Sequence, residues 1–223
     1  MAETNSRQLA SKWTKTAALM SNQTIASHIP ETRMYSKSNL LMMLNVHAMV
    51  VIKPVVGGGG HGVIKVAREQ GGYSYTYKTE RKSCATFNGL ADALQGMQRS
   101  RRYLIQKGIQ LASIQGRPID YRVKYVKEGG RWSYRAMVGR LARKGLFVTN
   151  LCRGGEQLSA SEGLRQSLAP GQVRRKKREM RKLTALSTRV LEQHFPGIGQ
   201  LGFDYGIDKK GKVWIFEVNT RPS

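Results

Sequence analysis

The stretch VWIFEVNTRP, residues 213–222, places two polar side chains, Glu217 and Asn219, inside an apolar strand pattern. Residues two apart in a strand point to the same face, so these two present oxygen ligands side by side, while Ile215, Phe216 and Val218 are expected to have structural positions. A carboxylate and an amide oxygen suit a hard cation such as Mg²⁺, which commonly binds together with phosphates. An edge strand with one solvated polar face is the alternative for this segment taken alone.

Another acidic residue lies upstream, in the segment GFDYGID at residues 202–208. The turn Asp208–Gly211 separates this segment from the strand that carries Glu217. A hairpin across this turn brings Asp204 back beside Glu217. The sequence therefore predicts a cluster of three oxygen ligands, which adds Asn219 to the two carboxylates.

The segment VVIKPVVGGGGHGVIKV, residues 50–66, indicates a strand, a glycine loop and a second strand. Lys53 ends the first apolar strand, and the proline after it favours an extended backbone. The loop that follows contains Gly57, Gly58, Gly59, Gly60, His61 and Gly62. Glycines allow backbone amides to approach an anion closely, because no Cβ intervenes, so we interpret the segment as a phosphate-binding loop. It is not a Walker loop, since the lysine precedes the glycines, and a flexible surface turn is the alternative.

Composition limits the classes of protein to which the chain can belong. The 223 residues have 40% hydrophobic content, which favours a globular protein over a disordered one. The net charge is +24 and the pI is near 10.6, and a phosphate ligand does not require 38 basic residues. The surplus indicates either general solubility or an acidic partner such as nucleic acid, an anionic cell-wall polymer, anionic lipid or an acidic protein.

Targeting features are few. No run of about 18 apolar residues exists, so the sequence predicts no membrane span. The first residues, MAETNSRQ, contain no signal-peptide core. Cys84 and Cys152 lack metal-ligand spacing and fit a reducing compartment, so we expect a cytoplasmic protein without a disulfide framework.

Hydrophobic periodicity predicts an α+β chain. Helices are expected at residues 7–27, 37–46, 86–99 and 170–194, with Thr86 as the N-cap of the third. The apolar side of the first helix is expected at Leu9, Trp13, Thr16, Ala17 and Met20. Strands are expected at residues 48–55, 62–68, 73–77 and 103–106, followed by a hairpin of 121–127 and 132–141. The longest helix carries RRKKR at residues 174–178, which is either a solvated helix face or a patch for a polyanion.

Six short segments, in this order along the chain, resemble the ATP-grasp superfamily. They are Lys15 in KTAAL, PET at 30–32, IKP with the glycine loop, DYR at 120–122, VTNLCRGG at 148–155, and FD followed by FEVNTRP. In that order they are similar to the YheC/YheD-type endospore coat-associated proteins of spore-forming bacteria. The resemblance covers nearly the whole chain, from about Lys12 to Ser223.

The resemblance implies an ATP-grasp fold, in which two lobes with antiparallel sheets clamp ATP. Residues 34–106 would form the small lobe with the glycine loop, and residues 107–223 the large lobe with the metal site. Residues 1–33 would form a helix and linker that pack on the large lobe. Because Lys15 takes the place of the first phosphate lysine, the Rossmann-like domain that usually precedes it is expected to be absent.

The resemblance also implies which residues bind the nucleotide. Lys15, Lys53 and the glycine loop, from Gly57 to Gly60 with His61 and Gly62, would contact the ATP phosphates. The hinge residues Gln106, Lys107 and Ile109 would bind adenine, mainly through the backbone. Leu111 stands where relatives often have an acidic residue for the ribose.

Metal and substrate residues follow from the same comparison. Asp204, Glu217 and Asn219 would hold two Mg²⁺ ions, and Asn150 would lie near the metals and phosphates. Arg122, Arg140 and Arg221 would face the substrate and the transferring phosphoryl group, since a guanidinium group suits a carboxylate or phosphate.

The function implied is that of an Mg²⁺-dependent ATP-binding protein, a carboxylate–amine (or thiol) ligase acting through an acyl phosphate in spore coat or envelope formation. Its partners would be ATP and an unidentified carboxylate and amine. The alternative is a non-catalytic ATP-grasp protein of the spore coat that has a structural or polyanion-binding role. Nucleic-acid binding is a weaker third hypothesis, because the basic residues are scattered and form no nucleic-acid-binding motif.

Overall fold

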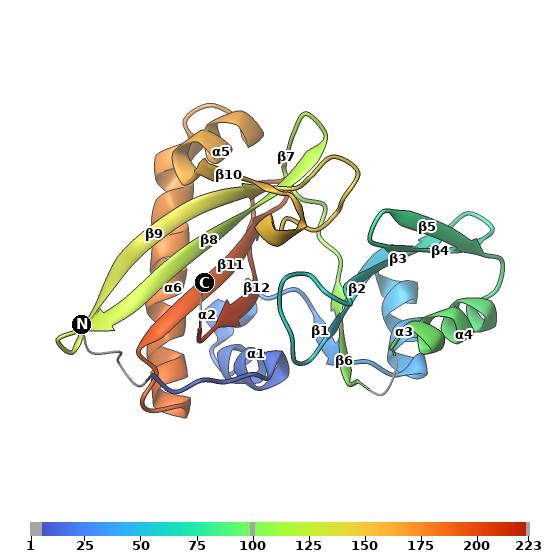
Figure 1. The fold of residues 1–223 in the computed structure, drawn as a ribbon, viewed down its shortest axis with the longest axis horizontal. Helices are drawn as coiled ribbons and strands as arrows, with labels where there is room; N and C mark the ends of the chain where they lie inside the picture. The colour runs from blue at the N-terminus through green and yellow to red at the C-terminus, as the bar shows by residue number, and fades with distance from the viewer. Residues whose placement is uncertain (1–5, 99–100, 222–223) are drawn as a thin grey trace.

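The computed structural model describes residues 6–98 and 101–221, which form two lobes that are each built on an antiparallel sheet (Figure 1). This architecture confirms the predicted α+β fold with two lobes. None of the helices in these residues is long and apolar enough to cross a membrane.

The small lobe contains a sheet in the strand order β1-β6-β2-β3-β4-β5. Alternating residues of β2 explain its two faces: Val50 and Ile52 are buried in the core, whereas Val51 and Lys53 line a cavity on the opposite face. Helices α3 and α4 pack on the core side (Figure 1). The elements are β1 (Thr32–Met34), α3 (Lys37–Val46), β2 (Met49–Pro54), β3 (Ile64–Glu69), β4 (Gly72–Tyr77), β5 (Glu80–Cys84), α4 (Phe87–Gln98) and β6 (Tyr103–Lys107).

The large lobe contains a sheet in the order β10-β9-β8-β11-β12, and β7 pairs with β8. Helices α5 and α6 pack against the face where Tyr121, Phe203 and Tyr205 are fully buried. The opposite face is turned toward the small lobe. The elements are β7 (Ser113–Ile114), β8 (Arg117–Glu128), β9 (Arg131–Leu141), the 3₁₀ turn η1 (Leu151–Arg153), β10 (Glu156–Ser159), α5 (Ala160–Ser167), α6 (Gln172–His194), β11 (Gln200–Ile207) and β12 (Val213–Asn219).

The N-terminal segment differs from the single helix predicted at residues 7–27. It forms α1 (Lys12–Met20) and the short α2 (Gln23–Ala26), which pack against α6. The Ser11 hydroxyl accepts a hydrogen bond from the Thr14 N–H and begins α1, and the Asn22 side chain accepts one from the Ile25 N–H and begins α2. The predicted apolar side was only partly correct: Leu9 and Met20 pack against the core, but the buried residues of α1 are Lys12, Lys15, Ala18 and Leu19.

Most other elements lie where periodicity predicts them. The helix expected at 37–46 is α3, the hairpin is β8–β9, and the longest helix is α6. The Thr86 hydroxyl accepts a hydrogen bond from the Gly89 N–H, as an N-cap does. The final residue of the helix expected at 86–99 lies outside the described residues. The sequence prediction missed β1, β5, β7, β10 and α5.

Candidate active site

A cavity of about 1250 Å³ lies between the two sheets and is lined by residues of both lobes. Of the residues that the sequence analysis selected, two do not line it: Lys15 and Gly62. Those that do are Lys53, Gly57, Gly58, Gly59, Gly60, His61, Gln106, Lys107, Ile109, Arg122, Arg140, Asn150, Asp204, Glu217, Asn219 and Arg221. Residues far apart in the sequence therefore meet at one place.

Strand register places the acidic and basic residues of the large lobe opposite one another. Asp204 on β11 is paired with Glu217 on β12 and with Arg122 on β8. On the neighbouring strand pair, Asp120 of β8 faces Arg140 of β9. The predicted meeting of Asp204 and Glu217 across the hairpin is thus confirmed.

These side chains form a continuous ionic network. Arg122 donates to both oxygens of Asp204, at 2.8 and 2.9 Å, and Arg140 also lies 3.1 Å from Asp204. Arg140 in turn donates to both oxygens of Asp120. Burial would raise the pKa of Asp204, but the two guanidinium groups outweigh it and hold this pKa below its ordinary value. Asp204 is therefore a carboxylate at neutral pH.

Asp120 has the opposite balance. Burial raises its pKa above the ordinary value, and the nearby charge of Asp204 adds to this effect, while Arg140 offsets part of it. No role had been assigned to Asp120 from the sequence. In the structure its contact with Arg140 fixes the orientation of the guanidinium group in the cavity.

A bulge in β12 aims a backbone carbonyl at Lys53. The register shifts between Asp204 and Tyr205, which leaves Phe216 as an extra residue on β12. Its carbonyl oxygen accepts a hydrogen bond of 3.0 Å from Lys53 Nζ. Phe216 was predicted to be structural, but it lines the cavity. The residues whose faces were predicted from alternation, Glu217 and Asn219, lie past the bulge and share the cavity side.

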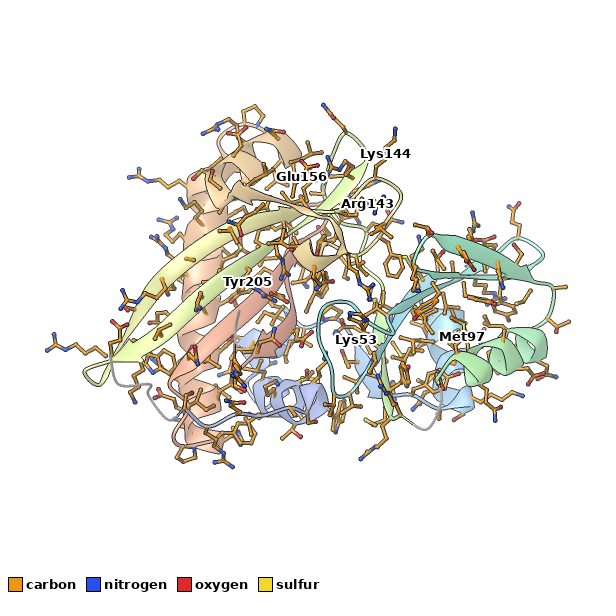
Figure 2. All side chains as sticks on the ribbon, in the orientation of Figure 1. Lys53, Met97, Arg143, Lys144, Glu156 and Tyr205 are labelled. Atoms are coloured by element: carbon orange, nitrogen blue, oxygen red, sulfur yellow. The ribbon has the colours of Figure 1, made fainter. Side chains whose placement is uncertain are left out.

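Lys53 is the buried cation of the small lobe and lies between the lobes (Figure 2). Its Nζ also donates to Gln106 Oε1 at 2.9 Å, and Gln106 Nε2 donates to the Thr32 hydroxyl. Burial lowers the pKa of Lys53 to about 8, although Glu217 partly opposes this shift. Gln106 was expected to contact nucleotide, whereas here it holds Lys53 in position.

The residue of α1 that reaches the cavity is Lys12, which the sequence analysis missed. Lys12 Nζ lies 3.3 Å from the Glu217 carboxylate and donates to the Gly57 carbonyl oxygen. Lys15, one turn later, is buried and donates to the Leu9 carbonyl oxygen instead. Burial lowers the pKa of Lys15 to about 8. The lysine predicted from the order of motifs, Lys15, therefore lies on the same helix as the lysine that lines the cavity, Lys12.

The glycine loop touches the large lobe at the segment 150–153. The Gly59 carbonyl oxygen accepts hydrogen bonds from Arg153 Nε at 3.2 Å and from the Cys152 thiol at 3.5 Å. Gly60 has a φ of +69°, and a Cβ at this position would lie 2.5 Å from Asn150 Oδ1. A Cβ there would require the Asn150 side chain to move, and the positive φ would strain any L-residue, so glycine suits this position of the loop.

Behind the glycine loop, the hinge joins the two sheets. The N–H groups of Lys107 and Gly108 donate to the carbonyl oxygens of Glu31 and Met49. Ile109 and Leu111 line the cavity, and Leu111 forms an isolated bridge with Asp208 at the end of β11. The hinge therefore marks the end of the cavity that lies beyond the carboxyl end of β11.

The donor set fits magnesium. In the described residues no three acidic, histidine or cysteine side chains lie together as a metal site. Mg²⁺, however, usually binds through one or two carboxylates together with water and substrate phosphates. Asp204 and Glu217 supply two such carboxylates, and Asn219 adds an amide oxygen on the same side of the cavity. Both carboxylates retain lone pairs beyond those used by Arg122, Arg140 and Lys12.

Comparisons with known proteins agree with this geometry. The chain is 32% identical to endospore coat-associated protein YheD of Bacillus subtilis over 95% of its own length and 48% of that protein. Its fold is similar to carboxyaminoimidazole ribonucleotide synthase from Aspergillus clavatus complexed with ATP, with a TM-score of 0.60, 10% identity and coverage of 97% of this chain and 46% of that one.

D-alanyl-alanine synthetase A from Vibrio cholerae has a TM-score of 0.55 and 14% identity, with coverage of 96% of this chain and 55% of that one. The chain thus spans about half the length of each of these proteins. The sequence model of the YheC/D-like ATP-grasp family matches residues 2–223. The chain therefore belongs to the YheC/D-like ATP-grasp family.

Proposed function

We propose that this chain binds Mg²⁺·ATP in the cavity and activates a carboxylate as an acyl phosphate, which an amine or thiol then attacks. One observation carries the proposal: Arg122, Asp204 and Glu217 occupy paired positions on three adjacent strands, facing Lys53 and the glycine loop across the cavity. Cations for phosphates and oxygen ligands for a metal therefore face one another.

The small lobe and the hinge supply the nucleotide contacts in this proposal. Adenine would lie at Ile109, where the backbone lines the cavity. Lys53 and Lys12 would contact the phosphates, and the amides of Gly57 to Gly60 would close over them. Lys53 already donates to two neutral acceptors, so it is held in place before the nucleotide arrives.

Asp204, Glu217 and Asn219 would hold one or two metal ions. When bound, Mg²⁺ would neutralise charge on the γ-phosphoryl oxygens and help align them for transfer. The chain's own contribution is positioning. Arg140 is fixed by Asp120 and Arg122 by Asp204, so both guanidinium groups point into the cavity with little freedom.

The reaction balances without a covalent enzyme intermediate. A substrate carboxylate oxygen attacks the γ-phosphorus, the bond to the β,γ-bridging oxygen breaks, and ADP leaves. The nitrogen or sulfur nucleophile then attacks the acyl carbon, inorganic phosphate leaves, and the nucleophile loses its proton. Arg122 and Arg140 would stabilise negative charge on the carboxylate and phosphoryl oxygens during these steps.

The names of similar proteins support the proposal. The Aspergillus enzyme is described as a synthase complexed with ATP, and the Vibrio enzyme as a synthetase. YheD is described as endospore coat-associated, which supports a role in spore coat or envelope formation.

A specific observation favours a second candidate, a spore coat protein that keeps the fold without turnover. Asp204 is neutralised by Arg122 and Arg140, and Glu217 by Lys12, so the chain's own cations already occupy the oxygen ligands. In such a protein the ionic network would serve to join the lobes.

Two measurements separate the candidates. Mg²⁺·ATP should raise the melting temperature, because a ligand that binds only the folded state stabilises it. ADP formation with a panel of carboxylates and hydroxylamine as nucleophile should then fall by about 100-fold or more in Glu217→Gln, since this variant keeps the shape but loses a charge at the proposed metal site.

The outcomes divide clearly. No thermal shift with millimolar Mg²⁺·ATP in a folded protein contradicts nucleotide binding. A shift without turnover for any carboxylate favours the non-catalytic candidate. Equal turnover by the wild type and a folded Glu217→Gln variant contradicts the metal assignment.

A further inference from the structure

Lys124 extends the row of charged residues on β8 that face the cavity. Asp120, Arg122 and Lys124 alternate along the strand and line the cavity, whereas Tyr121 and Val123 between them are fully buried in the core. No role in nucleotide binding follows for Lys124 from the motifs, and its neighbour on β9 is the small residue Ala136.

The strand register orders the cavity from one end to the other. The hinge lies at Leu111, which bridges to Asp208 beyond the end of β11. We call each row of residues that are paired across the sheet a level. The level next to the hinge contains Asp120, which is paired with Gly206, and the following level contains Arg122, which is paired with Asp204. Lys124 comes one level further, in line with Asn219, because both are paired with Gly202. Arg221 follows two residues after Asn219.

This order places Lys124 beyond the two carboxylates of the proposed metal site. A nucleotide that extends from the hinge meets Asp204 and Glu217 at the level of Arg122, whereas the amide ligand Asn219 lies one level further out, beside Lys124. Residues two apart on a strand are separated by about 7 Å, so Lys124 lies about 7 Å beyond the carboxylates. Lys124 is therefore at the outer edge of the metal site, on the side from which the molecule that accepts the phosphoryl group would approach.

The charges at this end of the cavity are not compensated by the protein. The carboxylates that line the cavity each have a cationic partner: Asp120 has Arg140, Asp204 has Arg122, and Glu217 has Lys12. Lys124 and Arg221, in contrast, have no carboxylate partner among residues 6–98 and 101–221. A basic surface of this kind, beyond the last acidic ligand, suits an anion.

We propose that the substrate is a dicarboxylate, one carboxylate of which is phosphorylated beside Arg122 while the other, about 7 Å away, is bound by Lys124 with Arg221 at the outer rim. The inference rests on the proposed function and adds the substrate class. The second carboxylate takes no part in the bond changes. It fixes the register of the substrate, so that the first carboxylate meets the γ-phosphorus.

The test compares acids of matched length. ADP and acyl hydroxamate are measured with Mg²⁺·ATP, hydroxylamine and either butyrate, valerate, hexanoate, succinate, glutarate or adipate at constant ionic strength. The wild type should use at least one dicarboxylate with a kcat/KM about tenfold or more above that for the monocarboxylates, since hydrogen bonds to charged groups contribute that much. Lys124→Gln should lose this preference because its kcat/KM for the dicarboxylate falls, while its kcat/KM for the monocarboxylates stays unchanged.

Charge reversal sharpens the result. Lys124→Glu should turn the preference toward 4-aminobutyrate and 5-aminopentanoate, whose far end is an ammonium group. Lys82→Gln is the matched control, because Lys82 is exposed on β5 and does not line the cavity. Its preference should equal that of the wild type.

A binding version of the test applies even without turnover. Thermal shifts are recorded with Mg²⁺ and a non-hydrolysable ATP analogue, with succinate, glutarate or adipate added, or the monocarboxylate of the same length. Equal effects of each dicarboxylate and its matched monocarboxylate in the wild type, no effect of any acid, or an unchanged preference in Lys124→Gln would each overturn the proposal. A missing shift with the ATP analogue itself identifies a failure of nucleotide binding instead.

Discussion

Lys53 is buried at the junction of the lobes, and its lowered pKa makes the stability of the protein depend on pH. In the unfolded chain a lysine keeps its proton up to its ordinary pKa of 10.5, whereas folded Lys53 releases it at about 8. Between these values the unfolded state binds more protons than the folded state. Stability therefore rises with pH across this interval, and the cost of burying the ammonium group is fully present below pH 8.

We predict that the free energy of unfolding of the wild type increases from pH 8 to 10.5 relative to that of Lys53→Met. The expected difference is about 1 kcal/mol per pH unit, because the variant has no proton to release at this position. Urea denaturation at several pH values measures it. Lys82→Met, an exposed lysine, should run parallel to the wild type, and a parallel course for Lys53→Met would contradict the lowered pKa.

Individual residues also show what the sequence could predict about the site. Glu217 and Asn219 were assigned one face by alternation, and Asp204 was placed beside Glu217 by a hairpin, since both are local geometry. Lys12 was missed because the phase of a helix against its neighbours is set by packing. The Phe216 bulge leaves no local signal, since it arises where β11 and β12 meet.

The glycine loop shows the same limits at the level of a whole segment. Its composition predicted close approach to an anion, but not that the segment 150–153 would be its protein partner. Gly60 contacts Asn150, and Gly59 accepts from Arg153. Closure of the loop is therefore coupled to the large lobe and not only to a ligand.

We predict that Gly60→Ala weakens nucleotide binding by about tenfold or more, because alanine is strained at a φ of +69° and its Cβ would clash with Asn150. Gly58→Ala is the matched control, since nothing lies within 4 Å of a Cβ at that position. Titration of a fluorescent ATP analogue with Mg²⁺ measures both. Equal affinities of the two variants would show that the closed loop does not contribute to binding.

Among the helices, length decided which could be predicted. The 23 residues of α6 carry a sustained apolar stripe, and Met180, Leu183 and Leu191 on this stripe are buried in the core. The break between α1 and α2 depends on the single cap Asn22, which periodicity does not detect. The strand β1 has only three residues and is defined by its pairing with β6.

The distribution of charge over the molecule divides the basic residues into two groups. One group lines the cavity. On α6, Lys176 is buried and paired with Glu179, so it does not belong to the exposed patch suggested by the run 174–178. The exposed basic residues in the first half of the helix form a set that we name the α6 stripe, consisting of Arg174, Arg175, Arg178, Arg181 and Lys182, and a further exposed arginine, Arg189, lies two turns later.

Members of the α6 stripe lie three and four residues apart and therefore share one face of the helix, opposite the apolar stripe. None of them has a carboxylate partner in the part of the chain that the structure describes. Such a face suits the regularly spaced phosphates of a linear polyanion. If the basic residues serve only general solubility, any exposed cation should contribute equally to polyanion binding.

We predict that replacing Arg174, Arg175 and Arg178 with Gln weakens binding to poly(glycerol phosphate) and to duplex DNA, and reduces the slope of log K against log salt by about 2 to 3, because three phosphate contacts are lost.

The control removes the same charge from the small lobe, where Lys37, Lys78 and Lys82 are exposed. If both triple variants lose affinity equally, the surplus charge acts through the whole surface. If the α6 variant alone loses it, the stripe is the polyanion site, and preference between the two polymers identifies its class. Since α6 lies behind the large sheet, ATP analogue affinity should stay unchanged in either variant, which keeps this test independent of the cavity (Figure 1).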